Sequence, residues 1–188
     1  GLLGTELSKF FHEKKIAHTN LSKNSDTEII CDLTSLTETL NLFEKYKPTI
    51  LINLVALTDV DRCEVNINEA YKINTKTVEN IVQASKNLEN FFLIHISTDQ
   101  IYDNINISKE CDIHIKNNYA LTKYAAEIAA KQVSSIILRT NFFGKGESSK
   151  QKSFSDWIIE NLENNNEITL FDDVFFNPLH FNTLCNLI

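Results

Sequence analysis

Short apolar runs alternate along the chain with longer segments whose apolar positions recur every three to four residues. The short runs, which predict strands, are residues 16–20, 28–31, 49–55, 91–97, 136–140 and 167–171. The longer segments, which predict helices, are residues 4–15, 35–46, 68–88, 118–133 and 153–165. The runs 49–55 and 91–97 are apolar at nearly every position, which is typical of central strands covered by helices on both faces.

This alternation of strand and helix predicts an α/β fold with a doubly wound, parallel, Rossmann-like sheet. Ser35 and Glu38 form a capping-box pattern at the start of the second helix, and Pro48 marks its exit. Ligands of such sheets bind at the carboxyl ends of the strands. We therefore look for functional residues directly after the apolar runs.

Composition limits the classes of partner. The net charge of −7 and the isoelectric point near 5.2 disfavour nucleic acid, which normally binds a basic face. The longest apolar run, residues 91–96, is far shorter than a membrane span and no signal peptide is evident, so we expect a cytoplasmic protein without a membrane partner. Cys31, Cys63, Cys111 and Cys185 lack metal or redox spacing, and we expect buried thiols and no metal site.

Two of the four glycines stand at the start of the first helix. Gly1 and Gly4 match the second and third glycines of a GxxGxxG turn, in which a pyrophosphate rests on the amide groups of the helix N-terminus. On this interpretation the first glycine and the leading strand lie upstream of Gly1. The alternative is that Gly1 stands there by accident and Gly4 is an ordinary helix-start residue.

Residues after the first two short strands are further candidates. Asp32, followed by Leu33, could bind an adenine amino group, or it simply begins the next helix. Lys23 follows the first strand, and no acidic residue near it could hold a ribose hydroxyl. Lys23 either meets a 2′-phosphate, which favours NADPH, or is an exposed surface lysine.

A tyrosine and a lysine four residues apart open the helix that follows the strand 91–97. Tyr119 and Lys123 therefore share one face of that helix. Reduction of a ketone by a nicotinamide hydride needs a proton, which a tyrosine can supply. We expect the ammonium of Lys123 to lower the pKa of Tyr119 from its usual value of about 10. Thr98 or Ser97, at the strand end, would hydrogen-bond the substrate oxygen.

The order of these motifs resembles that of the extended short-chain dehydrogenases/reductases, in the NAD-dependent epimerase/dehydratase superfamily, and most of all the dTDP-4-dehydrorhamnose reductase branch. The stretches that carry the resemblance are GLLGTEL, CDLT, INLVALTDVDRCE, INTKTVENIVQA, HISTDQIYD, YALTKYAAE, ILRTNFFGKG and FFNPLHFNTL. The resemblance implies an NAD(P)-dependent reductase of a keto group on a nucleotide-activated deoxysugar. It also implies NADPH or NADH as cofactor and is compatible with a homodimer.

The resemblance implies roles for individual positions. Thr98, Tyr119 and Lys123 would form the catalytic triad, with Tyr119 as the proton donor. The residues expected to bind the cofactor are Gly1, Gly4, Lys23, Asp32, Leu33, Val55, Ala56, Leu57, Asn74, Ser97, Tyr119 and Lys123. The residues expected to bind the substrate are Thr58, Asp59, Thr98, Asn141 and Phe142. Asn177 and Pro178 match the segment that leads into the substrate lobe.

The expected domains are a dinucleotide-binding Rossmann domain over residues 1–150, without its first strand, and the start of a substrate lobe over 151–188. Two alternatives to a reductase stay open. One is a nucleotide-sugar epimerase or dehydratase with the same tyrosine as base, and the other is a non-catalytic regulatory homologue. Gln100 after Asp99 weakens the dehydratase interpretation, because dehydratases usually carry an acid pair there. His95 lies in an apolar strand and is interpreted as a core residue.

Overall fold

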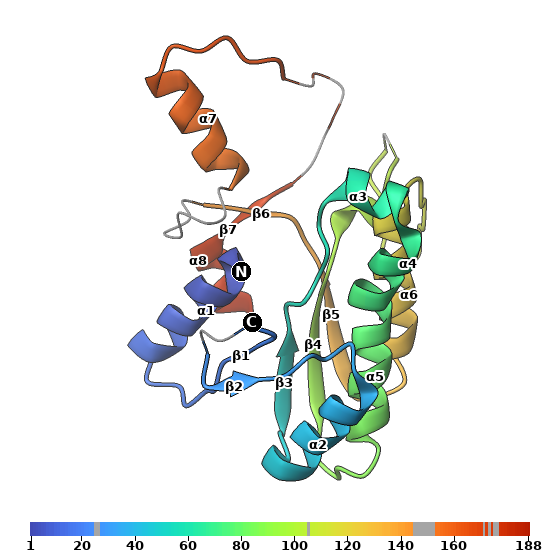
Figure 1. Cartoon of the computed structure of the whole chain (residues 1–188). Helices are drawn as coiled ribbons and strands as arrows, with labels where there is room; N and C mark the ends of the chain where they lie inside the picture. The colour runs from blue at the N-terminus through green and yellow to red at the C-terminus, as the bar shows by residue number, and fades with distance from the viewer. Residues whose placement is uncertain (25–26, 105, 145–152, 171, 173, 175–176) are drawn as a thin grey trace. The chain divides into compact units, whose positions relative to one another are not determined.

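The computed structural model describes residues 1–24, 27–104, 106–144, 153–170, 172, 174 and 177–188. These residues form two compact units. The larger unit is Thr19–Arg139, and the smaller unit combines Gly1–His18 with Thr140–Ile188. Figure 1 labels the helices and strands of both units.

The larger unit contains two parallel sheets. Its strands are β1 (Leu21–Ser22), β2 (Ile29–Ile30), β3 (Ile50–Asn53), β4 (Phe92–Ser97) and β5 (Ser135–Arg139). β1 pairs with β2, and the other three lie in the order β3-β4-β5. All of these pairings are parallel, as the sequence predicted. A doubly wound sheet has the strand order 3-2-1-4-5-6. In that order β1 and β2 take the places of strands 2 and 3, and β3, β4 and β5 take the places of strands 4, 5 and 6.

Two strand predictions need correction. The first strand begins after the predicted run 16–20, at Leu21. β3 was expected in the middle of a sheet, but among the described residues it is an edge strand, with Ile50 61% exposed. In the doubly wound order the strand at this place has a second neighbour, the first strand of the fold.

Helices cover one face of β3-β4-β5, where α4 and α5 follow one another in line and α6 runs beside them (Figure 1). The helical elements of the larger unit are α2 (Leu36–Tyr46), α3 (Val60–Val65), α4 (Ile67–Ala70), the π-helical turn η1 (Tyr71–Lys76), α5 (Thr77–Ser85), the 3-10 turn η2 (Asp99–Ile101) and α6 (Asn118–Ala130). The single helix predicted over 68–88 is thus divided by a π turn. The short helix α3 was not predicted.

The core of this unit lies between the sheet and helices α2, α5 and α6. It includes Leu93 of β4 and Val78 and Ile81 of α5, all 0% exposed. Alanines of α6, among them Ala126 and Ala130, complete it and let the helix approach the sheet closely. Each fully buried side chain of leucine or isoleucine size contributes about 1.5–3 kcal/mol through its removal from water.

Only half of the predicted capping box forms at the start of α2. The Ser35 hydroxyl accepts a hydrogen bond from the Glu38 backbone N–H (3.4 Å), as predicted. The Glu38 carboxylate instead accepts a hydrogen bond from the Asp32 backbone N–H (2.9 Å). The helix ends at Tyr46, and its C-cap Lys47, whose φ of 43° is left-handed, stands directly before Pro48.

The smaller unit contains α1 (Leu2–Glu13), β6 (Phe142–Phe143), α7 (Phe154–Glu163), β7 (Leu179–His180) and α8 (Phe181–Leu187). α1 buries Leu3 and Leu7 and lies beside α8. β6 and β7 pair in parallel. This pair and α8 were not predicted, and the strand predicted at 167–171 is wrong over 167–170, which have no regular structure. Phe171 lies outside the described residues.

Candidate active site

One face of α6 carries the central side chains of the candidate site. Asn117 caps this helix by accepting a hydrogen bond from the Ala120 backbone N–H (2.7 Å), which fixes where its first turn begins. Tyr119 and Lys123 follow one turn apart and are only 8% and 2% exposed. Both face the end of β4, where Thr98 is also buried, at 4% exposure.

The structure brings Tyr119 and Thr98 together. The Thr98 hydroxyl acts on the Tyr119 hydroxyl and lowers its pKa, and the tyrosine ring packs in a small cluster with Cys63 and Ala70. Burial raises the pKa of Tyr119 above its usual value, Thr98 opposes this effect and the Asp99 carboxylate adds to it. The expected lowering of this pKa is therefore wrong for the protein without cofactor, because desolvation of the phenolate dominates.

Lys123 is a buried cation with spare hydrogen-bonding capacity. Its Nζ donates to the Ile96 carbonyl (2.6 Å), the one acceptor it has among the described residues. Burial lowers its pKa to about 8, while the Glu127 carboxylate acts to raise it. An ammonium has three N–H donors. Lys123 could therefore also hold the hydroxyl groups of a ribose, which is what a nicotinamide cofactor at this site requires.

Asn74 fastens the segment after β3 to α6. Its Oδ1 accepts from the Leu57 backbone N–H (2.7 Å), and its Nδ2 donates to the Leu57 carbonyl (3.2 Å) and to Thr122 Oγ1 (3.0 Å). Asn74 lies within the π turn η1 and is fully buried. The wider turn directs its amide across to α6, and such turns are frequent at functional sites.

Ser97 and Thr98 have different surroundings, although the sequence left open which of them meets the substrate. The Ser97 hydroxyl is buried and donates a hydrogen bond to Glu127 Oε1 (2.6 Å). Thr98 Oγ1 accepts from the Gln100 backbone N–H (3.2 Å) and contacts Tyr119. Of the two hydroxyls, that of Thr98 is the one placed beside the tyrosine.

The residues predicted to bind adenosine contact one another. Lys23 Nζ and Asp32 Oδ2 form an ion pair (2.7 Å), and Asp32 Oδ1 also accepts from the side chain and backbone of Thr34 (2.8 and 3.0 Å). Leu33 is buried in the core, and its carbonyl accepts a hydrogen bond from Asn80 (2.9 Å). The Lys23–Asp32 pair places a cation and an anion together after β1 and β2.

The segment after β3 presents the next group of predicted residues. Val55 is 36% exposed, and Ala56 and Leu57 are half-buried. Thr58 and Asp59 are exposed, and Asp59 caps α3 by accepting a hydrogen bond from the Arg62 backbone N–H (2.9 Å). The expected contacts of these five residues with cofactor and substrate stay predictions.

Four predicted residues belong to the smaller unit. Gly1 is the N-cap of α1, and Gly4 lies in its first turn. Asn141 Oδ1 accepts from the Phe142 backbone N–H (2.8 Å), and the Phe142 ring lies 5.5 Å from that of Phe181. Asn177 and Pro178 belong to the same unit, just before β7. The remaining predicted site residues belong to the larger unit.

Sequence reasoning missed several polar residues around the site. Glu64 of α3 accepts hydrogen bonds from the backbone and side chain of Asn118, the residue before Tyr119. His95 is fully buried, as expected of a core residue, and its Nδ1 is hydrogen-bonded to Asn53 (3.1 Å). Its Nε2 has no hydrogen-bond partner among the described residues. Glu127 and Arg139 were also missed, although Glu127 lies four residues after Lys123 and the same spacing rule could have found it.

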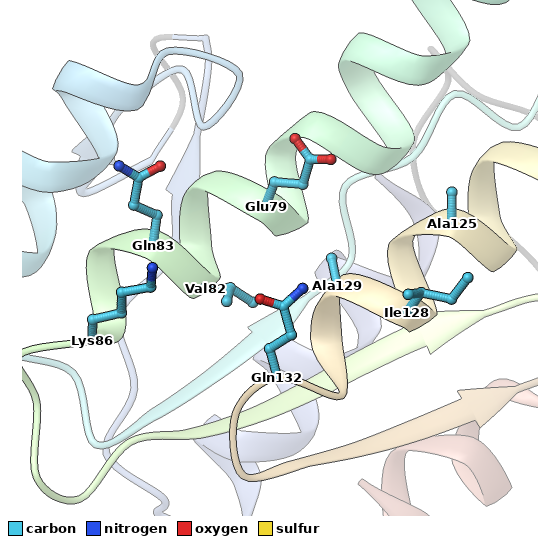
Figure 2. A pocket seen from close by; sticks show the side chains of 8 residues that line it. All are labelled: Glu79, Val82, Gln83, Lys86, Ala125, Ile128, Ala129 and Gln132. Atoms are coloured by element: carbon cyan, nitrogen blue, oxygen red, sulfur yellow. The ribbon is translucent and has the colours of Figure 1, made fainter.

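A hollow of about 270 Å³ lies elsewhere, on the outer side of α5 and α6 (Figure 2). Its lining residues are Glu79, Val82, Gln83, Lys86, Ala125, Ile128, Ala129 and Gln132. None of the predicted site residues lines it.

Of the cysteines, Cys111 is exposed, contrary to expectation, whereas the other three are buried. No helix in the described part of the chain is both long and apolar enough to span a bilayer.

Comparison with known proteins agrees with the resemblance seen in the sequence. The profile of the RmlD substrate binding domain family matches residues 1–188. A dTDP-4-dehydrorhamnose reductase of Aggregatibacter actinomycetemcomitans is 32% identical over 120 residues, which are 61% of this chain and 40% of that protein. The chain thus spans less than half the length of this relative.

Solved structures share the fold. The crystal structure of a hypothetical dTDP-4-dehydrorhamnose reductase from Sulfolobus tokodaii is 31% identical with a TM-score of 0.84, over 99% of this chain and 67% of that one. The dTDP-4-dehydrorhamnose reductase of Bacillus anthracis in complex with NADP has a TM-score of 0.87 at 24% identity, over 100% of this chain and 65% of that one. The predicted Rossmann-like α/β fold is confirmed, and the chain belongs to the RmlD substrate binding domain family.

Proposed function

We propose that this chain is the cofactor-binding and proton-donating part of an NAD(P)-dependent reductase that acts on a keto group of a nucleotide-activated deoxysugar. The observation that carries the proposal is the buried arrangement at the end of β4, where Tyr119 contacts Thr98 and Lys123 lies one helical turn further along α6. The names of the relatives support the substrate class. NADPH or NADH, when bound, supplies the hydride.

Each residue of the arrangement has a distinct task. Thr98 orients the substrate carbonyl through a hydrogen bond, and Tyr119 donates the proton that the carbonyl oxygen needs. The raised pKa of Tyr119 keeps its hydroxyl protonated near neutral pH, which suits a donor. Lys123 holds the nicotinamide ribose through its remaining N–H groups, and its ammonium favours the phenolate that proton transfer leaves behind.

The other predicted contacts belong to the same proposal. The cofactor contacts are Gly1, Gly4, Lys23, Asp32, Leu33, Val55, Ala56, Leu57 and Asn74. The substrate contacts are Thr58, Asp59, Asn141 and Phe142. Ser97 acts through Glu127 rather than directly, because its hydroxyl already donates to that carboxylate. Residues 1–150 would form the dinucleotide-binding domain, and residues 151–188 would begin the substrate lobe.

One contact favours a reductase over a dehydratase. Gln100 stands where a dehydratase would carry the second residue of an acid pair, and its Oε1 accepts a hydrogen bond from Asn117 Nδ2 (2.9 Å). An amide held in this way cannot protonate a leaving hydroxyl group. Asn117 also caps α6, so Gln100 helps to fix the start of the helix that carries Tyr119.

The test uses the full-length protein with NADPH or NADH and a panel of nucleotide 4-keto-deoxysugars. We expect loss of nicotinamide absorbance with the wild type and a decrease of about 10²–10⁴-fold in kcat for Tyr119→Phe. Cofactor affinity, measured by fluorescence titration, should fall far less than kcat in this variant, because the aromatic ring and the other cofactor contacts are kept. Cofactor binding without turnover of any keto-sugar would support the regulatory homologue instead, and equal rates for wild type and Tyr119→Phe would overturn the assigned role of Tyr119.

A further inference from the structure

A buried ion pair adjoins Lys123 in the larger unit. Glu127 lies on α6 one turn after Lys123 and is 0% exposed. Its Oε1 accepts hydrogen bonds from Ser97 Oγ (2.6 Å) and Arg139 Nε (2.9 Å), and its Oε2 accepts one from Arg139 Nη2 (2.7 Å). Ser97 and Arg139 are register neighbours on β4 and β5. The bidentate ion pair of Glu127 and Arg139, together with Ser97, therefore joins α6 to the carboxyl ends of β4 and β5.

The remaining nitrogen of the guanidinium holds the segment between β4 and α6. Arg139 Nη1 donates to the Tyr102 hydroxyl (2.9 Å) and to the Glu110 carbonyl (2.7 Å). The guanidinium also lies over the Tyr102 ring, 5.0 Å from its centroid. This segment begins at Thr98 and ends at Asn117. Arg139 thus contacts both the loop that follows Thr98 and the helix that carries Tyr119.

Stability alone is a weak reason to bury such a pair. Its removal from water is costly, and apolar residues of similar volume often serve a core equally well. The location of the pair is more informative, because the Glu127 carboxylate opposes the effect of burial on the pKa of Lys123. On β4, His95 also faces Lys123, and burial together with Lys123 keeps its pKa well below the usual value, so that it is neutral.

We propose that Glu127 and Arg139 are positioning residues of the active site: Glu127 keeps the buried Lys123 charged, and Arg139 fixes both Glu127 and the loop after Thr98. This inference rests on the proposed function, because it assigns the pair to the same site. It adds that the correct charge at Lys123 depends on a network reaching from α6 to β5. None of these contacts requires a bound cofactor.

The charge on Lys123 can be measured without any enzymatic assay. In full-length protein with carbon-13-labelled lysine, the Cε signal of Lys123, assigned through Lys123→Met, is titrated by NMR. We expect its midpoint to fall by about 1 unit or more in Glu127→Gln, the change that loss of one nearby opposite charge produces. The matched control is Glu79→Gln, which removes an exposed ion pair with Lys76 (3.0 Å) on α5 and should leave the midpoint unchanged. An unchanged midpoint in folded Glu127→Gln would overturn the proposed role of Glu127.

Glu127→Gln leaves Arg139 with no anionic partner and could unfold the protein. The double variant Glu127→Gln/Arg139→Gln removes both charges, so that no unpaired charge remains buried. A smaller downward shift of the Lys123 midpoint is expected in the double variant, because the positive charge of Arg139 is lost together with the negative charge of Glu127. A wild-type midpoint in that background would contradict the proposal as clearly as in the single variant.

The loop is tested with Arg139→Lys, which keeps the charge but loses the planar fork. Hydrogen exchange followed by mass spectrometry should show peptides from residues 99–116 exchanging about tenfold faster or more. This corresponds to a decrease of roughly 1.4 kcal/mol in the free energy of local opening. Peptides from α2, which lies away from the pair, should be unchanged. Exchange in 99–116 at the wild-type rate would overturn the role assigned to Arg139.

A pH profile connects the network to catalysis. Because the ammonium form of Lys123 is required, activity should fall as the pH rises through its pKa. In Glu127→Gln this alkaline loss of kcat/KM should begin at lower pH, a change that a purely structural role would not produce. If the wild type reduces no keto-sugar, the proposed function fails, whereas the titration and the exchange experiment still decide whether the pair positions Lys123 and the loop.

Discussion

Replacement of Asn74 by alanine should release the segment after β3 from α6. Asn74 is 0% exposed and makes three hydrogen bonds, two to the backbone of Leu57 and one to Thr122. At about 1 kcal/mol each, their loss should lower the free energy of unfolding by about 3 kcal/mol. That is a large share of the roughly 5–15 kcal/mol that stabilises a typical domain.

The measurement is urea unfolding followed by circular dichroism, combined with hydrogen exchange at the Leu57 amide. Asn80→Ala is the matched control, because Asn80 is equally buried but donates a single hydrogen bond, to the Leu33 carbonyl (2.9 Å). This control should lose only about 1 kcal/mol. If Asn74→Ala costs no more than Asn80→Ala and the Leu57 amide exchanges at the wild-type rate, Asn74 does not hold this segment.

Asn74→Asp sharpens the same test through its pH dependence. The new carboxyl group can still accept from the Leu57 N–H, but it can donate to the Leu57 carbonyl only when protonated. Burial and this hydrogen bond should raise its folded pKa above the unfolded value of about 3.9. The folded state then binds the proton more tightly, so the variant should be closest to wild type in acid and lose stability as the pH rises through the folded pKa. A difference that does not vary with pH would refute the hydrogen-bonding account.

Three further outcomes are expected. Because burial lowers the pKa of Lys123 to about 8, the wild type should be less stable than Lys123→Met by about 3 kcal/mol near pH 7. Urea unfolding should show this difference in the free energy of unfolding shrink as the pH rises from about 8 toward 10.5. Lys23→Ala should weaken NADPH binding by about tenfold or more and leave NADH binding unchanged in fluorescence titrations. Gly144→Ala should lower the melting temperature, because φ is +153° and the added Cβ would lie 2.3 Å from the Phe181 ring, and Phe181→Leu should restore part of the loss.

The pattern of apolar residues predicted the long buried strand β4 better than it predicted the two-residue strands. β4 begins within one residue of the predicted start and ends at Ser97, because a continuous apolar run has few alternatives to a central strand. The two-residue strands β6 and β7 are too short to show any period, so they were missed. Residues 167–170 alternate like a strand, but a pattern cannot state whether a partner strand exists.

At the site, the spacing of residues along the sequence predicted which side chains share a face of α6. The sequence did not show how deeply those side chains are buried. The four-residue spacing correctly placed Tyr119 and Lys123 on one face of α6, where both are buried. In the protein without cofactor the pKa of Tyr119 is raised rather than lowered, because desolvation depends on what packs around the ring. The sequence could have decided which of Ser97 and Thr98 lies beside the tyrosine. Strand residues alternate between faces, and Ser97 shares the helix-covered face with Leu93.

Two charged side chains on the buried side of α6 and two apolar ones on its exposed side depart from the usual pattern of a surface helix. Lys123 and Glu127 are 2% and 0% exposed, whereas Leu121 and Ile128 are 44% and 54% exposed. Lysine and glutamate are almost never fully buried unless they are paired, and burying them costs stability that an apolar face would not. Such departures from stable design are expected where function selects the residues. This departure is consistent with the proposal that the buried face of α6 is arranged for chemistry at Tyr119. If the proposed function holds, Lys123→Met should gain stability while losing reductase activity.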